Sequence, residues 1–208
     1  RRSLIVTSAS TALVVGCGDA ATPVDVPPDD TPPGDTSSPE DPLDDTGTPT
    51  CDETGDDIEG PFWVEGVPIR NDLDLHGDPG PRLSFEGVVR DALTCVPLAD
   101  AVVEIWHADP AGDYDGAADG KYRGQTRTDA DGAYRFETLV PGRYLNGPQF
   151  RPAHVHVKVW VEGVERLTTQ LYFANDPYND DDPWFDPDRI VADLDDGDLV
   201  EGMFDLVV

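Results

Sequence analysis

The sequence predicts an all-β fold, and more specifically an antiparallel β-sandwich. Short stretches in which apolar and polar residues alternate recur along the C-terminal two thirds of the chain. Turn-forming residues separate these stretches, and the chain contains 20 glycines and 20 prolines. No long amphipathic run of the kind that forms a surface helix is present. The 208 residues suffice for one domain with a core, together with tails.

The alternating stretches predict six strands, taken here in chain order. In the second predicted strand, residues 101–107, Val103 and Ile105 point to the same face. The turn-forming sequence Asp129-Ala-Asp-Gly132 leads into the third, residues 132–138. The predicted strands are residues 82–90, 101–107, 132–138, 154–160, 166–173 and 204–208. Two long connections, residues 108–120 and 175–188, are expected to be loops with a functional or mobile character.

The first 17 residues resemble a bacterial lipoprotein signal. Arg1 and Arg2 precede an apolar run from Leu4 to Val15 that is too short to span a bilayer as a helix. Small residues then lead to Cys17, which we expect to carry the lipid after cleavage. An ordinary secretory signal is the alternative, and the paired arginines also hint at twin-arginine export. We therefore expect an exported protein, periplasmic or on the cell surface.

Residues 18–57 are predicted to form a disordered acidic linker, followed by a folded domain at residues 58–208. The linker is rich in proline, threonine and aspartate, and no lysine or arginine occurs between Ser3 and Ile69. Such a segment buries too little apolar surface to offset its ordering entropy. With Cys17 lipidated, Cys51 and Cys95 remain, and an exported protein favours a disulfide between them. Two unpaired buried thiols are the alternative.

The charge of the chain excludes some classes of partner. Acidic residues outnumber basic ones 43 to 14, which gives a net charge of -29. Nucleic acid and anionic membrane surfaces would repel such a chain. Membrane contact is expected only through the lipid anchor at Cys17.

Two of the four histidines of the chain, His154 and His156, lie one residue apart in a predicted strand. Residues two apart in a strand point to the same side, so the two rings can approach one ion. A His-x-His pair on a strand is a metal signal. Two polar residues on a solvated face are the alternative.

Two tyrosines occur in glycine-containing segments outside the predicted strands, Gly112-Asp-Tyr114 and Pro141-Gly-Arg-Tyr144. A phenol with a pKa of roughly 10 ligates a metal well only when a hard, highly charged cation deprotonates it. Ferric iron meets that condition.

At these residues the sequence resembles the intradiol ring-cleavage dioxygenases, which include the catechol and protocatechuate dioxygenases. The resemblance covers about residues 59–179. It rests on Glu59-Gly-Pro-Phe62, Val103-Glu-Ile-Trp106, Gly112-Asp-Tyr114, Thr128-Asp-Ala-Asp-Gly132, Pro141-Gly-Arg-Tyr144, Arg151-Pro-Ala-His-Val-His156 and Thr169-Gln-Leu-Tyr-Phe173.

The resemblance implies a β-sandwich with one non-haem Fe(III). Its ligands would be Tyr114, Tyr144, His154 and His156, with a solvent hydroxide in the fifth position. The implied reaction inserts both atoms of O2 into a catechol-type aromatic diol. The ring opens between the hydroxylated carbons and gives a muconate-type diacid.

The resemblance also implies roles for three further groups. Arg151 would stabilise negative charge on the ring, although a surface salt bridge is the alternative from the residues alone. Gln170 would help to place the substrate, and Tyr144 would take up a substrate proton. The chain departs from the family after Tyr144, where Leu145-Asn-Gly147 replaces a tryptophan-containing segment, and it lacks the helical dimerisation region of catechol dioxygenases. Substrate identity and oligomeric state therefore stay open.

Two other functions compete with this one. A non-catalytic prealbumin-like module of a surface lipoprotein would share the segment from Thr128 to Tyr144. A zinc hydrolase would use His154, His156 and a carboxylate, and it leaves the tyrosines unexplained. The remaining aromatic and polar residues are expected to be structural: Trp106 and Trp160 in the core, Tyr134 and Tyr172 in the core or on a sheet face, Tyr122 in packing, His107 as a hydrogen-bonded core or rim residue, His76 exposed, Asp129 and Asp131 in a hairpin turn and not in a calcium site, and Trp184 at a pocket rim.

Overall fold

The computed structural model describes residues 51–208 apart from 74–76 and 195–196. These residues form eleven strands and two short 3-10 helices, which confirms the predicted all-β class. The strands are β1 (Arg82–Arg90), β2 (Val102–Trp106), β3 (Arg123–Arg127), β4 (Ala133–Leu139), β5 (Tyr144–Asn146), β6 (Gln149–Arg151), β7 (His154–Val161), β8 (Val164–Ala174), β9 (Ile190–Asp193), β10 (Leu199–Met203) and β11 (Leu206–Val207). The 3-10 helices are η1 (Asn179–Asp181) and η2 (Pro187–Arg189).

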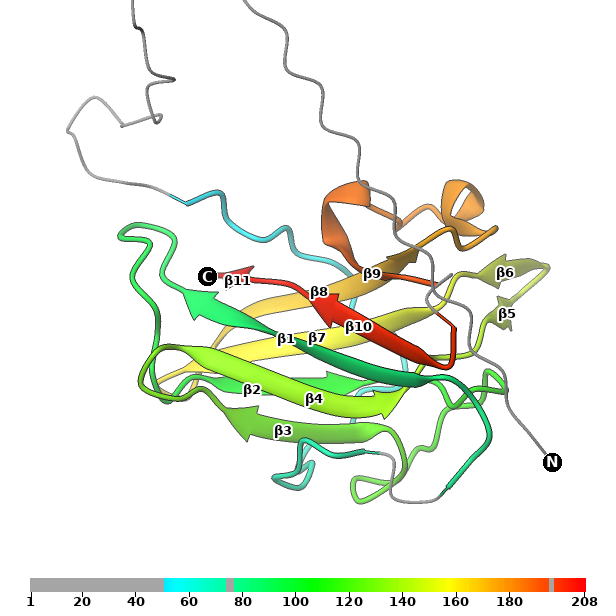
Figure 1. Ribbon diagram of the computed structural model, residues 1–208, viewed down its shortest axis with the longest axis horizontal. Coiled ribbons are helices and arrows are strands. Elements are labelled where there is room, and N and C mark those ends of the chain that lie inside the picture. Colours follow the sequence, from blue (N-terminus) through cyan, green and yellow to red (C-terminus); the bar gives the residue numbers. More distant parts are fainter. Residues whose placement is uncertain (1–50, 74–76, 195–196) are drawn as a thin grey trace, which may run out of the picture. The chain divides into compact units, whose positions relative to one another are not determined.

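Two sheets pack face to face, as the predicted sandwich requires (Figure 1). The larger has the order β3-β2-β7-β8-β9, and in the smaller β1 pairs with β4, β10 and β11. A separate two-stranded ribbon joins β5 to β6. Three pairings are parallel, namely β1 with β10, β1 with β11 and β8 with β9, so the sandwich is mixed and not purely antiparallel.

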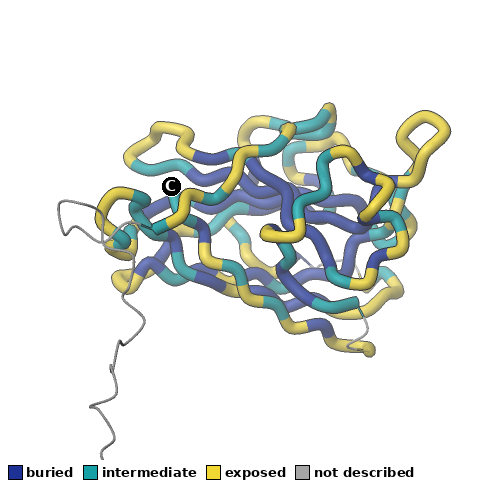
Figure 2. The backbone as a smooth tube through the Cα atoms, turned by 90° about the horizontal axis from the view of Figure 1, so that it is seen from above, coloured by how far each residue is buried: buried dark blue, intermediate teal, exposed yellow. Residues whose placement is uncertain are grey.

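One apolar core lies between the two sheets. Leu83 and Phe85 of β1 face Val155 and Val157 of β7 across it, all at most 1% exposed. Figure 2 shows the buried backbone through the middle of the domain and exposed positions gathered in the connecting loops. Six of the eight residues of β7 are buried, so its second face is covered as well. That second face carries His154 and His156.

The six predicted strands are present, and the structure adds strands that the pattern did not indicate. β3 has the sequence RGQTR, without a large apolar residue, and its Gly124 packs tightly against the Arg70 backbone. β10 pairs with β1, which is distant in sequence, and β9 pairs in parallel with the preceding strand β8. The predicted last strand, residues 204–208, is reduced to the two residues of β11.

A segment that we name the strap, residues 51–63, is held on the domain. Composition predicts a linker as far as residue 57, but residues 51–57 form hydrogen bonds with the sheets. The Thr54 N–H donates to the Val207 carbonyl at 3.0 Å and the Asp57 N–H to the Thr168 carbonyl at 2.8 Å. The buried Asp57 carboxylate pairs with Arg189 at 2.6 Å. Backbone hydrogen bonds and this ion pair fix residues 51–57 of the strap, a stretch without large apolar residues.

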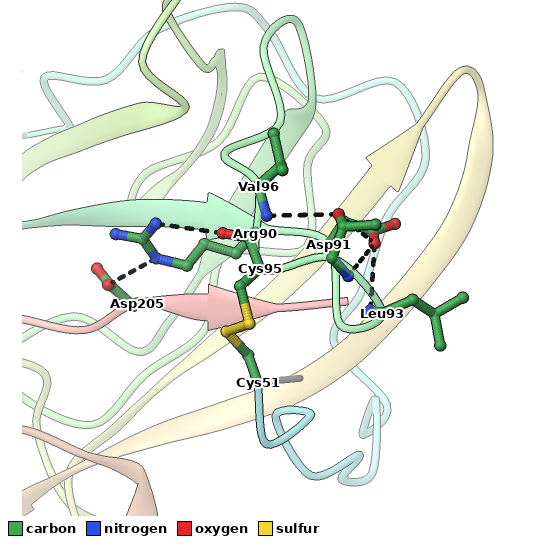
Figure 3. The surroundings of a disulfide bond; sticks show 8 residues. Cys51, Arg90, Asp91, Leu93, Cys95, Val96 and Asp205 are labelled. Atoms are coloured by element: carbon green, nitrogen blue, oxygen red, sulfur yellow. Dashed lines mark hydrogen bonds and ion pairs between the residues drawn. A yellow bond between two sulfur atoms is a disulfide. The ribbon is translucent and has the colours of Figure 1, made fainter. Parts of the chain in front are cut away.

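The predicted disulfide between Cys51 and Cys95 is present, with 5.4 Å between the Cα atoms (Figure 3). It joins the start of the strap to the turn after β1, where Arg90 donates to Asp205 and to the Cys95 carbonyl. The predicted signal at residues 1–17, with Cys17, and residues 18–50 of the predicted linker lie outside the described residues. Of the described helices, none has the length and apolar character needed to cross a membrane.

Candidate metal centre

The structure brings Tyr114, Tyr144, His154 and His156 together. The ring centroids of Tyr114 and Tyr144 lie 5.5 Å apart, and those of Tyr144 and His154 lie 5.7 Å apart. The two histidine rings are 4.9 Å apart, and Tyr114 is 6.2 Å from His156. The Tyr114 hydroxyl is 3.3 Å from His154 Nε2. Four rings from three separate segments therefore surround one small volume.

The two histidines share the outer face of β7, as their spacing predicts. The Nδ1–H of His154 donates to the Pro152 carbonyl at 2.8 Å, which directs the Nε2 lone pair toward Tyr114. The His156 ring stacks on Trp106 with centroids 4.7 Å apart. Among the described residues, His156 Nδ1 has no hydrogen-bond partner. The protein thus fixes one imidazole by a hydrogen bond and the other by stacking.

Burial keeps both imidazoles neutral. It lowers the pKa of His154 to about 3, and the Arg151 cation acts in the same direction. Burial together with the neighbouring His154 holds the pKa of His156 well below its usual range. A neutral imidazole offers a nitrogen lone pair, which is the form that binds a metal.

Burial acts on Tyr114 in the direction that favours the neutral phenol. It raises the pKa of this tyrosine well above 10, and the nearby Tyr144 adds to the effect. The Phe62 ring of the strap stacks on Tyr114 at 4.1 Å and meets Tyr144 edge-on at 6.3 Å. Only a strong positive charge at this place would make Tyr114 a phenolate.

The donor set fits a hard trivalent cation. Two neutral imidazoles supply nitrogen and two phenols supply oxygen, which becomes anionic beside such an ion. Within the described part of the chain, no three His, Cys, Asp or Glu side chains are grouped so that they could hold a metal. The oxygen donors beside the two histidines are therefore the tyrosines.

Arg151 and Gln170 lie next to this group, and Arg151 is buried, in contrast to the surface salt bridge considered from sequence. Arg151 ends β6 opposite Tyr144 of β5, and Gln170 lies opposite His156 across β7 and β8. Arg151 Nη2 donates to Gln170 Oε1 at 2.8 Å, and Gln170 Nε2 donates to the Ile58 carbonyl at 3.0 Å.

Asp182 and Trp184 bracket the Arg151 guanidinium. Nε and Nη2 of Arg151 donate to Asp182 Oδ2 at 3.0 and 2.8 Å, and the Trp184 ring lies 4.6 Å from Arg151 Cζ. Burial opposes the charge, but Asp182 raises the pKa of Arg151 above its ordinary value. Sequence reasoning missed Asp182, because one of 43 acidic residues carries no distinguishing signal. It also missed that Phe62 stacks on Tyr114.

Most residues expected to be structural are buried in the core. The Nδ1–H of His107 donates to the Ala108 carbonyl at 2.7 Å, and its Nε2 accepts from the Thr138 hydroxyl at 2.9 Å. Burial lowers the pKa of His107 to about 4. Tyr122, Tyr134, Tyr172 and Trp106 are all at most 4% exposed. Trp160 is only partly buried, so its predicted place in the core is corrected. Asp129 accepts from the backbone of Asp131 and Ala133 and so closes a hairpin turn, while His76 lies outside the described residues.

Comparison with known proteins identifies the relatives of this chain. A family model described as "Dioxygenase" matches residues 58–200. Chlorocatechol 1,2-dioxygenase of Rhodococcus opacus is 34% identical over 154 residues, which cover 62% of this chain and 60% of the relative. Catechol 1,2-dioxygenase 2 of Acinetobacter lwoffii is 38% identical over 148 residues, which cover 60% of this chain and 53% of the relative. The chain thus spans less than two thirds of the length of these relatives.

Solved structures show the same fold. The dioxygenase domain of a dioxygenase carbohydrate-binding protein fusion from Streptomyces sp. SirexAA-E superposes with a TM-score of 0.67 and 38% identity, covering 76% of this chain and 98% of that one. The 3-chlorocatechol 1,2-dioxygenase of Rhodococcus opacus 1CP gives a TM-score of 0.66 and 29% identity, covering 74% of this chain and 72% of that one.

Proposed function

This chain belongs to the intradiol ring-cleavage dioxygenase family, and we propose that it is a non-haem Fe(III) enzyme that cleaves a catechol-type aromatic diol with O2. The product is a muconate-type diacid. The observation that carries this proposal is the convergence of two phenols and two neutral imidazoles, with the Tyr114 hydroxyl 3.3 Å from His154 Nε2.

Tyr114, Tyr144, His154 and His156 are the proposed ligands of the iron. When bound, Fe(III) acts as a Lewis acid and template that makes the coordinated diol reactive toward O2. The residues of the chain hold this chemistry in place. Pro152 sets the tautomer of His154, and Trp106 holds the plane of His156.

Arg151 supplies the fixed positive charge beside the ring. A diol that binds through both oxygens carries negative charge, which a preorganised guanidinium stabilises as it spreads over the ring. Asp182 and Trp184 keep the guanidinium in one orientation, and its contact with Gln170 places the amide of that residue beside the substrate position. Gln170 thus orients the substrate through the same contact network.

Tyr144 is the proposed acceptor of a substrate proton. A diol that binds as a dianion must release two protons, so a base is needed close to its oxygens. Tyr144 is less enclosed than the histidines and lies at the start of the β5–β6 ribbon, where its oxygen, held as a phenolate by the bound cation, could accept one proton while a solvent hydroxide in the site would accept the other. The Tyr144 oxygen is then protonated while the substrate occupies the site.

The charges around the site favour a diol without a carboxylate. Arg151 is paired with Asp182, Arg143 with Asp176 and Lys158 with Glu59, all at 2.8 Å. Arg123, a further buried cation nearby, donates to the carbonyls of Phe62 and Asp115. With Arg151 serving the diol itself, an added substrate carboxylate would find Arg143 and Lys158 already paired with carboxylates and Arg123 bound to backbone carbonyls, in a chain whose net charge is -29.

We further propose that the enzyme is exported as a lipoprotein carrying its lipid at Cys17. The lipoprotein-like residues 1–17 and the acidic stretch that follows support this location. The Cys51–Cys95 disulfide agrees with it, because disulfides persist in oxidising compartments.

The function is tested by oxygen uptake of the iron-loaded protein with catechol, followed by identification of the product. We expect one O2 consumed per ring opened and an intradiol diacid as product. A catechol bearing a ring carboxylate should react at least tenfold more slowly. An iron-loaded protein that consumes no O2 with either diol would contradict the enzymatic function and leave a non-catalytic module.

A further inference from the structure

The two proposed tyrosine ligands occur in the same three-residue pattern, Gly-x-Tyr. Gly112 precedes Tyr114 by two residues, and Gly142 precedes Tyr144 by two. In the fold, each glycine lies against the backbone of the other tyrosine's loop. The contact has no part in the chemistry proposed above, yet it lies directly behind both phenols.

Gly142 packs on the first loop without room for a side chain. An added Cβ would lie 2.4 Å from the Gly112 nitrogen, 2.6 Å from the Pro110 carbonyl oxygen and 2.8 Å from that of Asp109. All three are backbone atoms, which cannot rotate away as a flexible side chain can. Even one methyl group at residue 142 would therefore push the two loops apart.

Gly112 makes the reciprocal contact. An added Cβ would lie 2.4 Å from the Arg143 carbonyl oxygen and 3.4 Å from Tyr144 Cβ. The φ angle of Gly112 is +94°, a conformation that residues with a side chain adopt only with strain. Conformation and close approach both require glycine at this residue.

Asp109 joins the two loops by hydrogen bonds. Its carbonyl accepts from the N–H groups of both Gly112 and Gly142, each at 2.9 Å. Its carboxylate Oδ1 accepts from the N–H of Ala111 at 2.8 Å and of Asp113 at 3.0 Å. The Asp109 carboxylate thus stabilises the loop that carries Tyr114, and the Asp109 carbonyl oxygen links that loop to the one that carries Tyr144.

We propose that this Gly112–Gly142 contact is a positioning device that sets the separation of the Tyr114 and Tyr144 oxygens. Both phenols leave the contact after one intervening residue, and their rings lie 5.5 Å apart. Because the backbones of the two loops are in direct contact, the distance between the Tyr114 and Tyr144 oxygens is fixed, and both oxygens can reach one ion. The inference rests on the proposed function, because it assigns these two tyrosines to one Fe(III).

The first test is Gly142→Ala, with Gly116→Ala as the matched control. Gly116 lies just after Tyr114, and an added Cβ there has nothing within 4 Å. Each variant is loaded with Fe(III), and the tyrosinate charge-transfer band in the visible and the bound iron are measured. Gly142→Ala should shift or halve the band and weaken iron binding at least tenfold, while Gly116→Ala should match the natural protein.

The second test is Gly112→Ala, with Gly147→Ala as the control for backbone strain. Gly147 has a φ of +66° and open space around its Cβ position, so it shares the conformation but not the contact. A changed band in Gly112→Ala alone supports the inference. Equal changes in the two variants would assign the effect to strain and overturn it.

Asp109→Ala covers the case in which the glycine variants do not fold. It removes the two carboxylate hydrogen bonds without adding an atom, and it should shift the band in the same direction by a smaller amount. Unchanged spectra in Asp109→Ala and in every folded glycine variant would overturn the positioning role. A natural protein that shows no band with Fe(III) would instead contradict the proposed function.

Discussion

The outer faces of the two sheets differ sharply, although their inner faces share one core. On the five-stranded sheet the outer face buries His154, His156, Lys158 and Glu104 beneath the strap and loops. On the four-stranded sheet the outer face exposes Arg135, which pairs with Glu86 and Glu137 in solvent. The first face is polar but enclosed, and the second is polar and wet.

The outer face of the five-stranded sheet is the one whose burial costs free energy. Burying a charged or polar group is unfavourable unless hydrogen bonds and counter-charges compensate. Exposed ion pairs contribute little to stability. The strap supplies much of the compensation on the enclosed face: Glu59 pairs with Lys158, and the Trp63 indole donates to Glu104 at 2.8 Å. The proposed function gives a reason for this cost, because it requires neutral imidazoles and an oriented guanidinium on the enclosed face.

The largest effect on stability is expected from Asp182→Ala. The change leaves the Arg151 cation buried without its carboxylate, and both side chains are at most 4% exposed. Loss of one partner of a buried pair costs about 3–5 kcal/mol. Denaturant unfolding should show this loss, while Glu86→Ala on the exposed face should leave the midpoint unchanged. An equal loss of stability in Asp182→Ala and Glu86→Ala would contradict the proposed difference between the enclosed and the exposed face.

A smaller loss in the free energy of unfolding is expected from replacing both Cys51 and Cys95 by serine. The disulfide closes a separation of 44 residues, and loss of such a bridge costs about 2–4 kcal/mol. The site should be unaffected, because Asp57 and Glu59 anchor the strap between the disulfide and Phe62. The charge-transfer band of the iron-loaded variant should match that of the natural protein. A displaced band would mean that the disulfide also positions the site.

The smallest effect is a change in pH dependence from Glu104→Gln. Burial raises the pKa of Glu104 to about 7 from an ordinary 4.5, against the opposing influence of Trp63, Lys158 and Arg123 and with a small contribution from Glu165. The folded state therefore holds a proton that the unfolded chain releases first. The stabilisation from this proton is complete below the unfolded pKa and is lost as the pH rises through about 7.

Unfolding of the natural protein and of Glu104→Gln at about pH 5 and pH 8 checks this sign. The glutamine variant should gain stability relative to the natural protein on going to the higher pH. A relative loss at high pH would show that Glu104 is ionised and stabilising on the enclosed face.

Local pattern predicted part of this architecture. The period of two placed His154 and His156 on one face, and it located six strands. The parallel pairing of β1 with β10 was not predictable, because it joins segments distant in the sequence. Residues 51–57 of the strap resemble a linker by composition, because the backbone hydrogen bonds and the buried ion pair that hold them leave no apolar pattern in the sequence. Neighbouring glycines and the family resemblance indicated Tyr114 and Tyr144. The pairing of Asp182 with Arg151 could be recognised only in the folded structure.

The most direct test of the account is a crystal structure of the Fe(III)-loaded protein with anomalous data collected at the iron absorption edge. We expect one iron peak per chain, bonded to the phenol oxygens of Tyr114 and Tyr144 and to one ring nitrogen each of His154 and His156. An iron peak elsewhere on the chain, or one bound by the histidines with both tyrosines turned away, would contradict it.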